Sequence, residues 1–141
     1  MQNKLKKIFG IGPVGALISL LLLVCFVGAD SMMKLPIITG NAVLLKIFGM
    51  VCVVFGFGLH FWSFFTLRNW WVKDQLCTNG PFRYLRHPMY AAWISFICPG
   101  VAFFLNSWLY VLWVMVVHLL WHRLLKKEET IMMEIFGETY K

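Results

Sequence analysis

Apolar residues along the chain fall into four long stretches separated by short polar segments. They run over residues 13–29, 42–65, 89–105 and 108–125, and charged residues are sparse within each stretch. A helix needs about 20 apolar residues, and at least about 17, to cross the roughly 30 Å hydrocarbon core of a bilayer. The pattern therefore predicts four transmembrane helices.

The third and fourth stretches are joined only by Asn106 and Ser107. So short a connection predicts an antiparallel helical hairpin. Pro99 and Gly100 interrupt the third stretch. Because proline removes a backbone hydrogen bond inside a helix, we expect a kink or a local unwinding there.

The composition agrees with a chain that lies mainly within a membrane. Hydrophobic residues make up 60% of the chain and charged residues 13%, whereas soluble domains carry about 25% charged residues. The mean hydropathy is +0.75. These values exclude a soluble globular domain, a disordered chain and a coiled coil. We expect an all-α integral membrane protein in which residues 1–141 form one domain.

Basic residues gather on one side of the predicted spans. An excess of Lys and Arg marks the cytoplasmic side of a membrane protein. This rule places both termini, the loop 66–88 and the tail 126–141 in the cytoplasm, with only Lys34 and Lys46 on the other side. The residues of the basic side are Lys4, Lys6, Lys7, Arg68, Lys73, Arg83, Arg86, Arg123, Lys126, Lys127 and Lys141.

The net charge of +7 reflects this topology and favours contact with anionic lipid headgroups. We expect no nucleic-acid binding, because no basic domain lies outside the membrane. The apolar run 13–29 is longer than the 7–15 residues typical of a signal peptide, so we expect it to be retained. A bacterial-type inner membrane or an endomembrane would suit such a protein.

Cysteine and histidine patterns give little support for a metal or redox site. The four cysteines stand apart, without a C-x-x-C pair or a histidine at zinc spacing, so we predict no metal site. His118 and His122 lie four residues apart on one helix face, and His60 lies in another span. A non-catalytic four-span protein, such as a haem-binding or quinone-binding subunit or an assembly factor, therefore stays open as the second hypothesis.

A first polar cluster lies just before the third span, over residues 74–90. Pro88 suits the first position of a helix, where its missing N–H costs nothing. The N–H groups of Met89, Tyr90 and Ala91 would then be free to bind an anion or a carboxylate. The alternative is that the basic residues here only anchor the chain at the lipid headgroups and that Tyr90 belongs to the interfacial aromatic belt.

A second polar cluster follows the fourth span, over residues 122–140. Good helix-forming residues predict that the helix of this span continues into the cytoplasm as a short C-terminal helix, and Gly137 is a natural stop. Glu128 and Glu129 are adjacent, so they point about 100° apart and cannot act as one acid/base pair. On the plainer interpretation they only solvate the helix.

Taken together, two motifs and the hairpin between them resemble the superfamily of isoprenylcysteine carboxyl methyltransferases and phospholipid methyltransferases. The first motif is Gly-Pro-Phe followed by Arg-His-Pro-x-Tyr, over residues 80–90. The second is Glu128-Glu129 followed by Phe-Gly-x-x-Tyr, over residues 136–140. The resemblance covers about half of the chain, and the order and spacing of the parts are what make it specific.

The resemblance implies a membrane methyltransferase that binds S-adenosyl-L-methionine. In such enzymes the His-Pro-x-Tyr segment, the loop before it and one glutamate enclose the cofactor. Glu128 is preferred to Glu129 because it stands nine residues before Gly137. Carried over by position, the cofactor-binding residues are Leu76, Cys77, Phe82, His87, Pro88, Met89, Tyr90 and Glu128.

The same resemblance implies a lipophilic acceptor that reaches the site through the bilayer. Its accepting group would be a carboxylate, an amine or a thiol on an isoprenoid or another lipid. Arg86 or Arg123 would orient an anionic acceptor as the catalytic residue, because a guanidinium binds carboxylates and phosphates well.

The predicted orientation can be tested with reporter fusions. A reporter placed after Lys141 and one inserted near Asn79 should both report the cytoplasm, and one near Pro36 should report the opposite side. An external signal from the Asn79 insertion would contradict the topology.

Overall fold

The computed structural model describes residues 10–33, 35–70 and 77–137. Regular structure in these residues is helical, apart from an isolated bridge between Ile37 and Ser107. Four helical segments among them are long and apolar enough to cross a membrane. The prediction of an all-α membrane protein with four spans is therefore confirmed.

Each predicted span corresponds to a helical segment whose ends reach somewhat further. The segments are α2 (Gly12–Met33), α3 (Ala42–Arg68), a composite third span (Pro88–Leu105) and α6 (Trp108–Phe136). As expected, the fourth span continues without a break, and it ends at Gly137 with φ +55°.

The third span contains three kinds of helix. It consists of α4 (Pro88–Ala92), a π-helical turn η2 (Trp93–Ile97) and α5 (Cys98–Leu105), and Cys98 N–H donates to Trp93 O. Pro99 follows immediately, and its ring would clash with a carbonyl of the preceding turn in a regular α-helix. The wider π-helical turn relieves this clash. The local unwinding that we predicted is present, one turn before Pro99.

The hairpin between α5 and α6 is also present. Asn106 adopts the left-handed conformation with φ +53°, and Ser107 Oγ accepts a bond from Leu109 N–H over 3.4 Å. The Asn106 amide exchanges two hydrogen bonds with the backbone of Thr39, of 3.0 and 3.1 Å. These bonds join the hairpin turn to the chain between α2 and α3.

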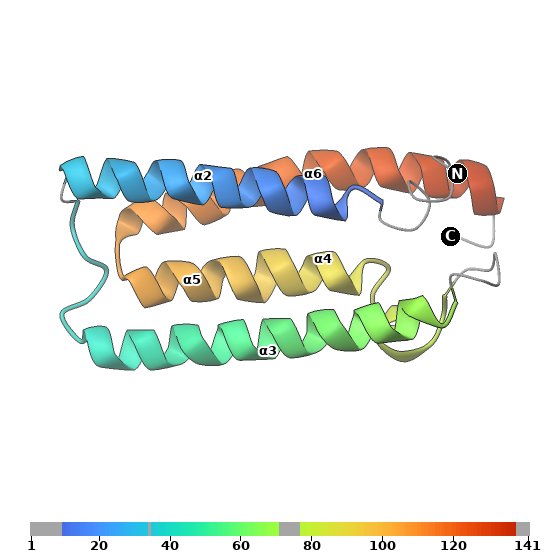
Figure 1. Cartoon of the computed structure of the whole chain (residues 1–141), viewed down its shortest axis with the longest axis horizontal. Helices are drawn as coiled ribbons and strands as arrows, with labels where there is room; N and C mark the ends of the chain where they lie inside the picture. The colour runs from blue at the N-terminus through green and yellow to red at the C-terminus, as the bar shows by residue number, and fades with distance from the viewer. Residues whose placement is uncertain (1–9, 34, 71–76, 138–141) are drawn as a thin grey trace.

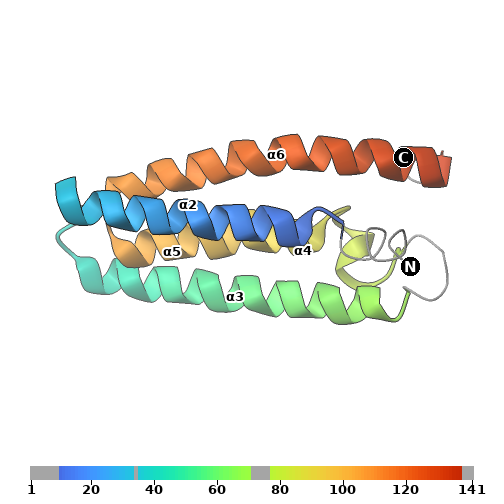
Figure 2. The same ribbon diagram turned by 45° about the horizontal axis from the view of Figure 1, so that its top comes forward.

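The helices form two pairs. Figures 1 and 2 show α2 lying along α6, while α3 lies along the composite span of α4, η2 and α5. The starts of α2 and α4 and the ends of α3 and α6 lie together at one end of the bundle. We call this the basic end, because its described residues include Arg68, Arg83, Arg86, Arg123, Lys126 and Lys127.

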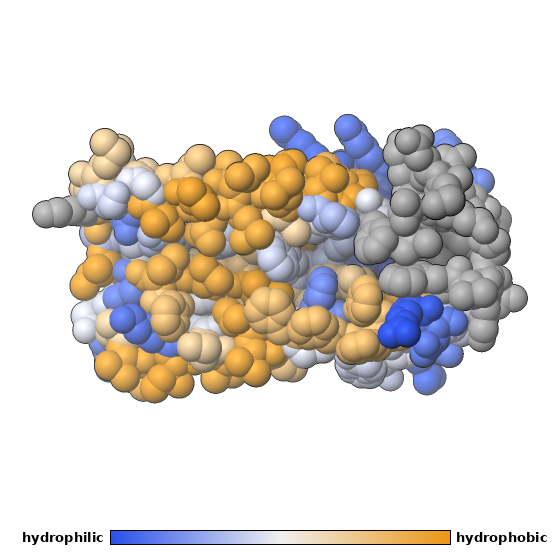
Figure 3. All heavy atoms as spheres, viewed as in Figure 1, coloured by the Kyte–Doolittle hydropathy of each residue, from blue (hydrophilic) through white to orange (hydrophobic). Residues whose placement is uncertain are grey.

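The outer surface of the bundle suits a lipid environment. Figure 3 shows apolar residues covering most of the length of the helices on the face in view. Many large apolar side chains are exposed on this surface; Val24 is 70%, Val43 67% and Leu119 65% exposed. Monomers in water rarely expose apolar patches of this extent. With its four spans, the chain is a multi-pass membrane protein.

Polar contacts join α2 to α6 along an antiparallel seam. Trp121 Nε1–H donates to Ser19 Oγ over 2.9 Å, and Trp113 Nε1–H donates to Ser19 O over 3.2 Å. Further along, Tyr110 Oη–H donates to Asp30 Oδ2 over 3.1 Å. Ser19 and Asp30 are as far apart in sequence as Tyr110 and Trp121 are, and the two pairs run in opposite directions. The two antiparallel helices therefore keep one register along this seam.

Two glycines let α3 and α5 touch through their backbones. A Cβ atom on Gly49 would lie 2.5 Å from Gly100 O and 2.8 Å from Phe104 N. Glycine at helix interfaces permits such close packing in membranes. The pairing of α3 with the third span therefore depends on the absence of a side chain here.

We expect Gly49→Ala to lower the free energy of unfolding by about 1–3 kcal/mol, because overpacking forces the helices apart. The matched control is Gly58→Ala in the same helix, where an added Cβ meets nothing within 4 Å. Reversible unfolding in mixed detergent micelles measures both variants. Equal stability of the two would contradict the packing.

Candidate functional site

A carboxylate at the basic end is held by donors from two other parts of the chain. Tyr90 Oη–H donates to Glu128, with distances of 2.9 Å to Oε2 and 3.1 Å to Oε1. Ile11 N–H donates to Glu128 Oε2 over 3.2 Å. Glu128 on α6 thus meets α4 and the turn that precedes α2.

Aromatic rings continue from this carboxylate in both directions. The Tyr90 ring stacks on the His87 ring, with centroids 5.5 Å apart and planes 11° apart. On its other side it meets the Trp121 ring, with centroids 5.0 Å apart. Pro88 begins α4 and His87 stands just before it. The start of α4 therefore sets the spacing of His87 and Tyr90.

His87 also faces the second glutamate. Its Nε2 lies 3.9 Å from Glu129 Oε1, and the Glu129 side chain is 43% exposed. Burial lowers the pKa of His87 below the ordinary histidine value of 6.5, and the nearby charge of Arg86 adds to this. The carboxylates of Glu128 and Glu129 oppose the shift. The balance favours a neutral imidazole beside two carboxylates.

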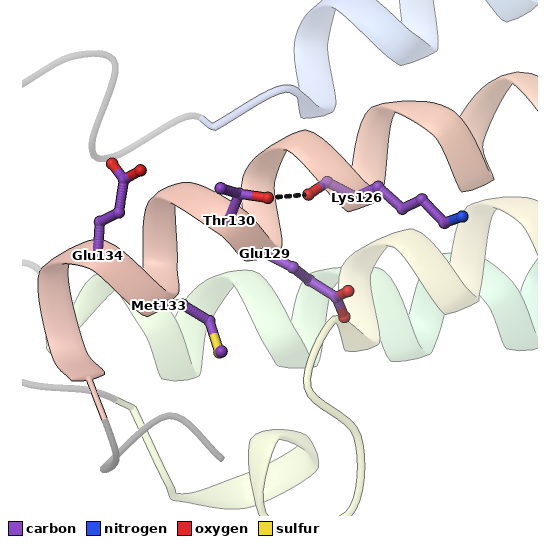
Figure 4. Close-up of a pocket in the computed structure, with 5 residues that line it drawn as sticks. All are labelled: Lys126, Glu129, Thr130, Met133 and Glu134. Carbon is purple, nitrogen blue, oxygen red and sulfur yellow. Dashed lines mark hydrogen bonds between the residues drawn. The ribbon is translucent and has the colours of Figure 1, made fainter.

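An open hollow of about 560 Å³ lies next to the site on α6. Figure 4 shows Glu129 pointing from α6 toward the start of α4, and Glu134 pointing away from it. Glu129 therefore borders both the hollow and the site. The lining residues are Lys126, Glu129, Thr130, Met133 and Glu134.

Comparison with known families decides the kind of protein. The family model for phospholipid methyltransferases matches residues 44–139. The chain belongs to this family. Membership implies a membrane methyltransferase, and it confirms the resemblance drawn from the two motifs and the hairpin. No curated protein and no solved structure matches the chain.

The family match ends near the C-terminus but begins inside α3. It thus includes Tyr90 and Glu128, whereas Ile11 and the whole of α2 lie outside it. The Glu128 carboxylate of this phospholipid methyltransferase family member is therefore held from both inside and outside the matched region.

Two of the other predicted cofactor residues lie in the segment that precedes α4. Cys77 is buried, and burial raises the pKa of its thiol, against a smaller opposing effect of a backbone hydrogen bond with Asn79. Phe82 is half-buried in η1, the short 3-10 helix Gly80–Arg83, which packs on α3. Leu76 lies outside the described residues.

Pro88 and Met89 help to build the site through the backbone. Pro88 is fully buried at the start of α4. The Met89 carbonyl oxygen lies 3.4 Å from His60 Nδ1 on α3. This contact connects the beginning of the third span to its neighbouring helix.

One expectation about the start of α4 was wrong for two of its three N–H groups. We expected the N–H groups of Met89, Tyr90 and Ala91 to be free for an anion. Tyr90 N–H and Ala91 N–H instead both donate to His87 O, over 3.1 and 2.9 Å. The helix begins with a tight turn that uses these two donors, so they are not available to an anion.

The structure separates the two arginines named as catalytic. Arg86 precedes His87 and is exposed, and its charge affects the pKa of that imidazole. Arg123 is exposed on α6, five residues before Glu128. Five residues correspond to about 140° around a helix. Arg86 is therefore near the site, and Arg123 lies on another face of α6.

Sequence reasoning missed three contributors to the site. Gly10 and Ile11 precede the first span, and only their position before it could attract notice. Trp121 resembled an ordinary residue of an apolar span. A glycine beside a helix start hints at close approach of the backbone to something, but the partner lies more than 100 residues away.

We predict that His87 titrates below 6.5, because its environment disfavours the charged imidazolium. Glu129→Gln should lower its pKa further by removing a nearby negative charge, and Arg86→Gln should raise it. Histidine NMR titration in micelles measures this, with His87→Gln identifying the resonance. A rise in Glu129→Gln would contradict the assignment of neighbours.

Proposed function

We propose that this protein transfers a methyl group from S-adenosyl-L-methionine to a lipophilic acceptor at the cytoplasmic face of the membrane. One observation carries the proposal. In a chain of a methyltransferase family, Glu128 is fixed beside the aromatic rings of Tyr90 and His87. The basic end of the bundle would then face the cytoplasm, as the Lys and Arg distribution favours.

The residues present fit the chemical groups of this cofactor. A carboxylate accepts hydrogen bonds from ribose hydroxyls or from an ammonium group. Glu128 receives bonds from two protein donors, while a carboxylate offers about four lone-pair positions. It therefore keeps capacity for a ligand. The flat rings of His87 and Tyr90 suit stacking with an adenine base.

The chemistry asks the protein mainly for alignment and for exclusion of water. When bound, the cofactor supplies a methyl group on a sulfonium, which a lone pair of the acceptor takes by displacing a neutral thioether in line. In this reaction Glu128 and Tyr90 would hold the donor. The apolar ring of Trp121, which is buried, would exclude water on the membrane side.

The acceptor would come from the bilayer, because the molecule is covered by apolar side chains beyond the basic end. It would be an isoprenoid or another lipid carrying a carboxylate, an amine or a thiol. Arg86 would orient an anionic group of such an acceptor. Arg123 could serve an acceptor only along the other face of α6.

The non-catalytic alternative has less support than the methyltransferase. A haem site between helices would need histidines that converge. His60 contacts the third span, whereas His118 and His122 are exposed on α6. Among the described residues, no three His, Cys, Asp or Glu side chains are grouped to hold a metal. Family membership also points to a methyltransferase.

Cofactor binding tests the proposal. S-adenosylhomocysteine, the demethylated product, should bind the purified protein in nanodiscs with micromolar affinity by calorimetry. Glu128→Gln should weaken binding about ten-fold or more, because a hydrogen bond to a charged group contributes about 1.5–3 kcal/mol. Tyr90→Phe should weaken it as well.

The matched control is Glu134→Gln, which removes the same charge from the same helix but on a side chain that points away from the start of α4. If it weakens binding as much as Glu128→Gln, general surface charge explains the effect and Glu128 has no special role. Absence of binding to the wild-type protein would refute the proposed function.

A further inference from the structure

Residues 10–12 form the turn before α2 and the first residue of that helix, close to Tyr90 and Glu128, and we call them the strap. We propose that the backbone of the strap positions the Glu128 carboxylate for the cofactor. This inference rests on the proposed function. It assigns a role to a segment outside the family match, which begins at residue 44.

The strap fits against the site only because it is built on glycine. A Cβ atom on Gly10 would lie 2.8 Å from Tyr90 Oη and 2.9 Å from Glu128 Oε1. Gly10 also has φ +50°, a conformation that side chains disfavour. A Cβ atom on Gly12 would lie 2.9 Å from Tyr90 Cε1. Between the two glycines, Ile11 presents its N–H to the carboxylate.

The seam between α2 and α6 fixes the position of the strap along the axis of α6. Ile11 O accepts a bond from Gly15 N–H over 2.9 Å, which starts the helix. A Cβ atom on Gly15 would lie 2.8 Å from the Trp121 ring, and Trp121 in turn bonds Ser19. Sliding α2 along α6 would break these contacts, so the strap is held at the level of Glu128.

The geometry favours a strap that positions Glu128 over a strap that competes with the cofactor for this carboxylate. Of the two carboxylate oxygens, Ile11 N–H donates to Oε2, and the hydroxyl of Tyr90 contacts both. Oε1 therefore keeps the greater capacity for a ligand. A carboxylate fixed by two donors loses little freedom when it binds a third. The strap thus prepares Glu128 for the cofactor and does not occupy its place.

Alanine substitutions in the strap test this role with S-adenosylhomocysteine as the probe. Gly10→Ala and Gly12→Ala should each weaken its binding to the full chain in nanodiscs by about ten-fold. Gly28→Ala is the matched control in α2, because an added Cβ there meets nothing within 4 Å. It should bind like the wild type. Gly12→Ala is the gentler variant, since Gly12 has no positive φ, and it decides the test if Gly10→Ala fails to fold.

A double-mutant cycle separates positioning from general scaffolding. If the strap acts through Glu128, then Gly10→Ala together with Glu128→Gln should bind no more weakly than Glu128→Gln alone. Additive losses would overturn the inference, and so would wild-type affinity in both glycine variants. Tighter binding would overturn it too, because the strap would then be a competitor. A wild type that binds no probe would instead refute the proposed function, and the role of the strap with it.

Discussion

Two indole N–H groups in an apolar environment set the register on which the site depends. A buried polar group without a partner is costly, most of all in a bilayer, where no water can replace the missing bond. Ser19 satisfies both donors, with its hydroxyl for Trp121 and its carbonyl for Trp113. Ser19 of α2 is thereby bonded to two separate turns of α6, at Trp113 and at Trp121. This register brings the start of α2 close to Glu128.

The site lies where the polar and apolar parts of the molecule meet. Glu128 lies on α6 just beyond the apolar stretch 108–125 of the sequence, while Tyr90 and Trp121 lie within apolar stretches. A polar cofactor and a lipophilic acceptor would need such a boundary, because each could approach from its own phase. The carboxylate would bind the polar cofactor, and the exposed apolar helices would contact the lipophilic acceptor.

Most of the fold could be predicted from hydropathy and turn chemistry. Four apolar runs gave four spans, Asn106 and Ser107 gave the hairpin, and Pro99 indicated the irregular turn. These features depend on neighbours in sequence. The position of the π-helical turn was off by one turn, because the strain of a proline is relieved in the residues before it.

The candidate site could be predicted only in part. The motif residues Tyr90 and Glu128 do meet, although 38 residues separate them. The expectation of free N–H groups at the start of α4 was wrong for Tyr90 and Ala91, because both donate to His87 O in a tight first turn. The contribution of Ile11 depends on the seam between α2 and α6, which no local pattern reveals. Contacts set by helix register need the folded chain.

A structure with S-adenosylhomocysteine bound is the most direct test of the account. We predict that the ligand lies between α4 and α6, with a ribose hydroxyl or its ammonium group within hydrogen-bond distance of Glu128 and its adenine beside the ring of His87 or Tyr90. Ile11 N–H should still contact the carboxylate. A ligand bound elsewhere, such as in the hollow along Lys126 and Thr130, or a strap displaced from Glu128, would contradict it.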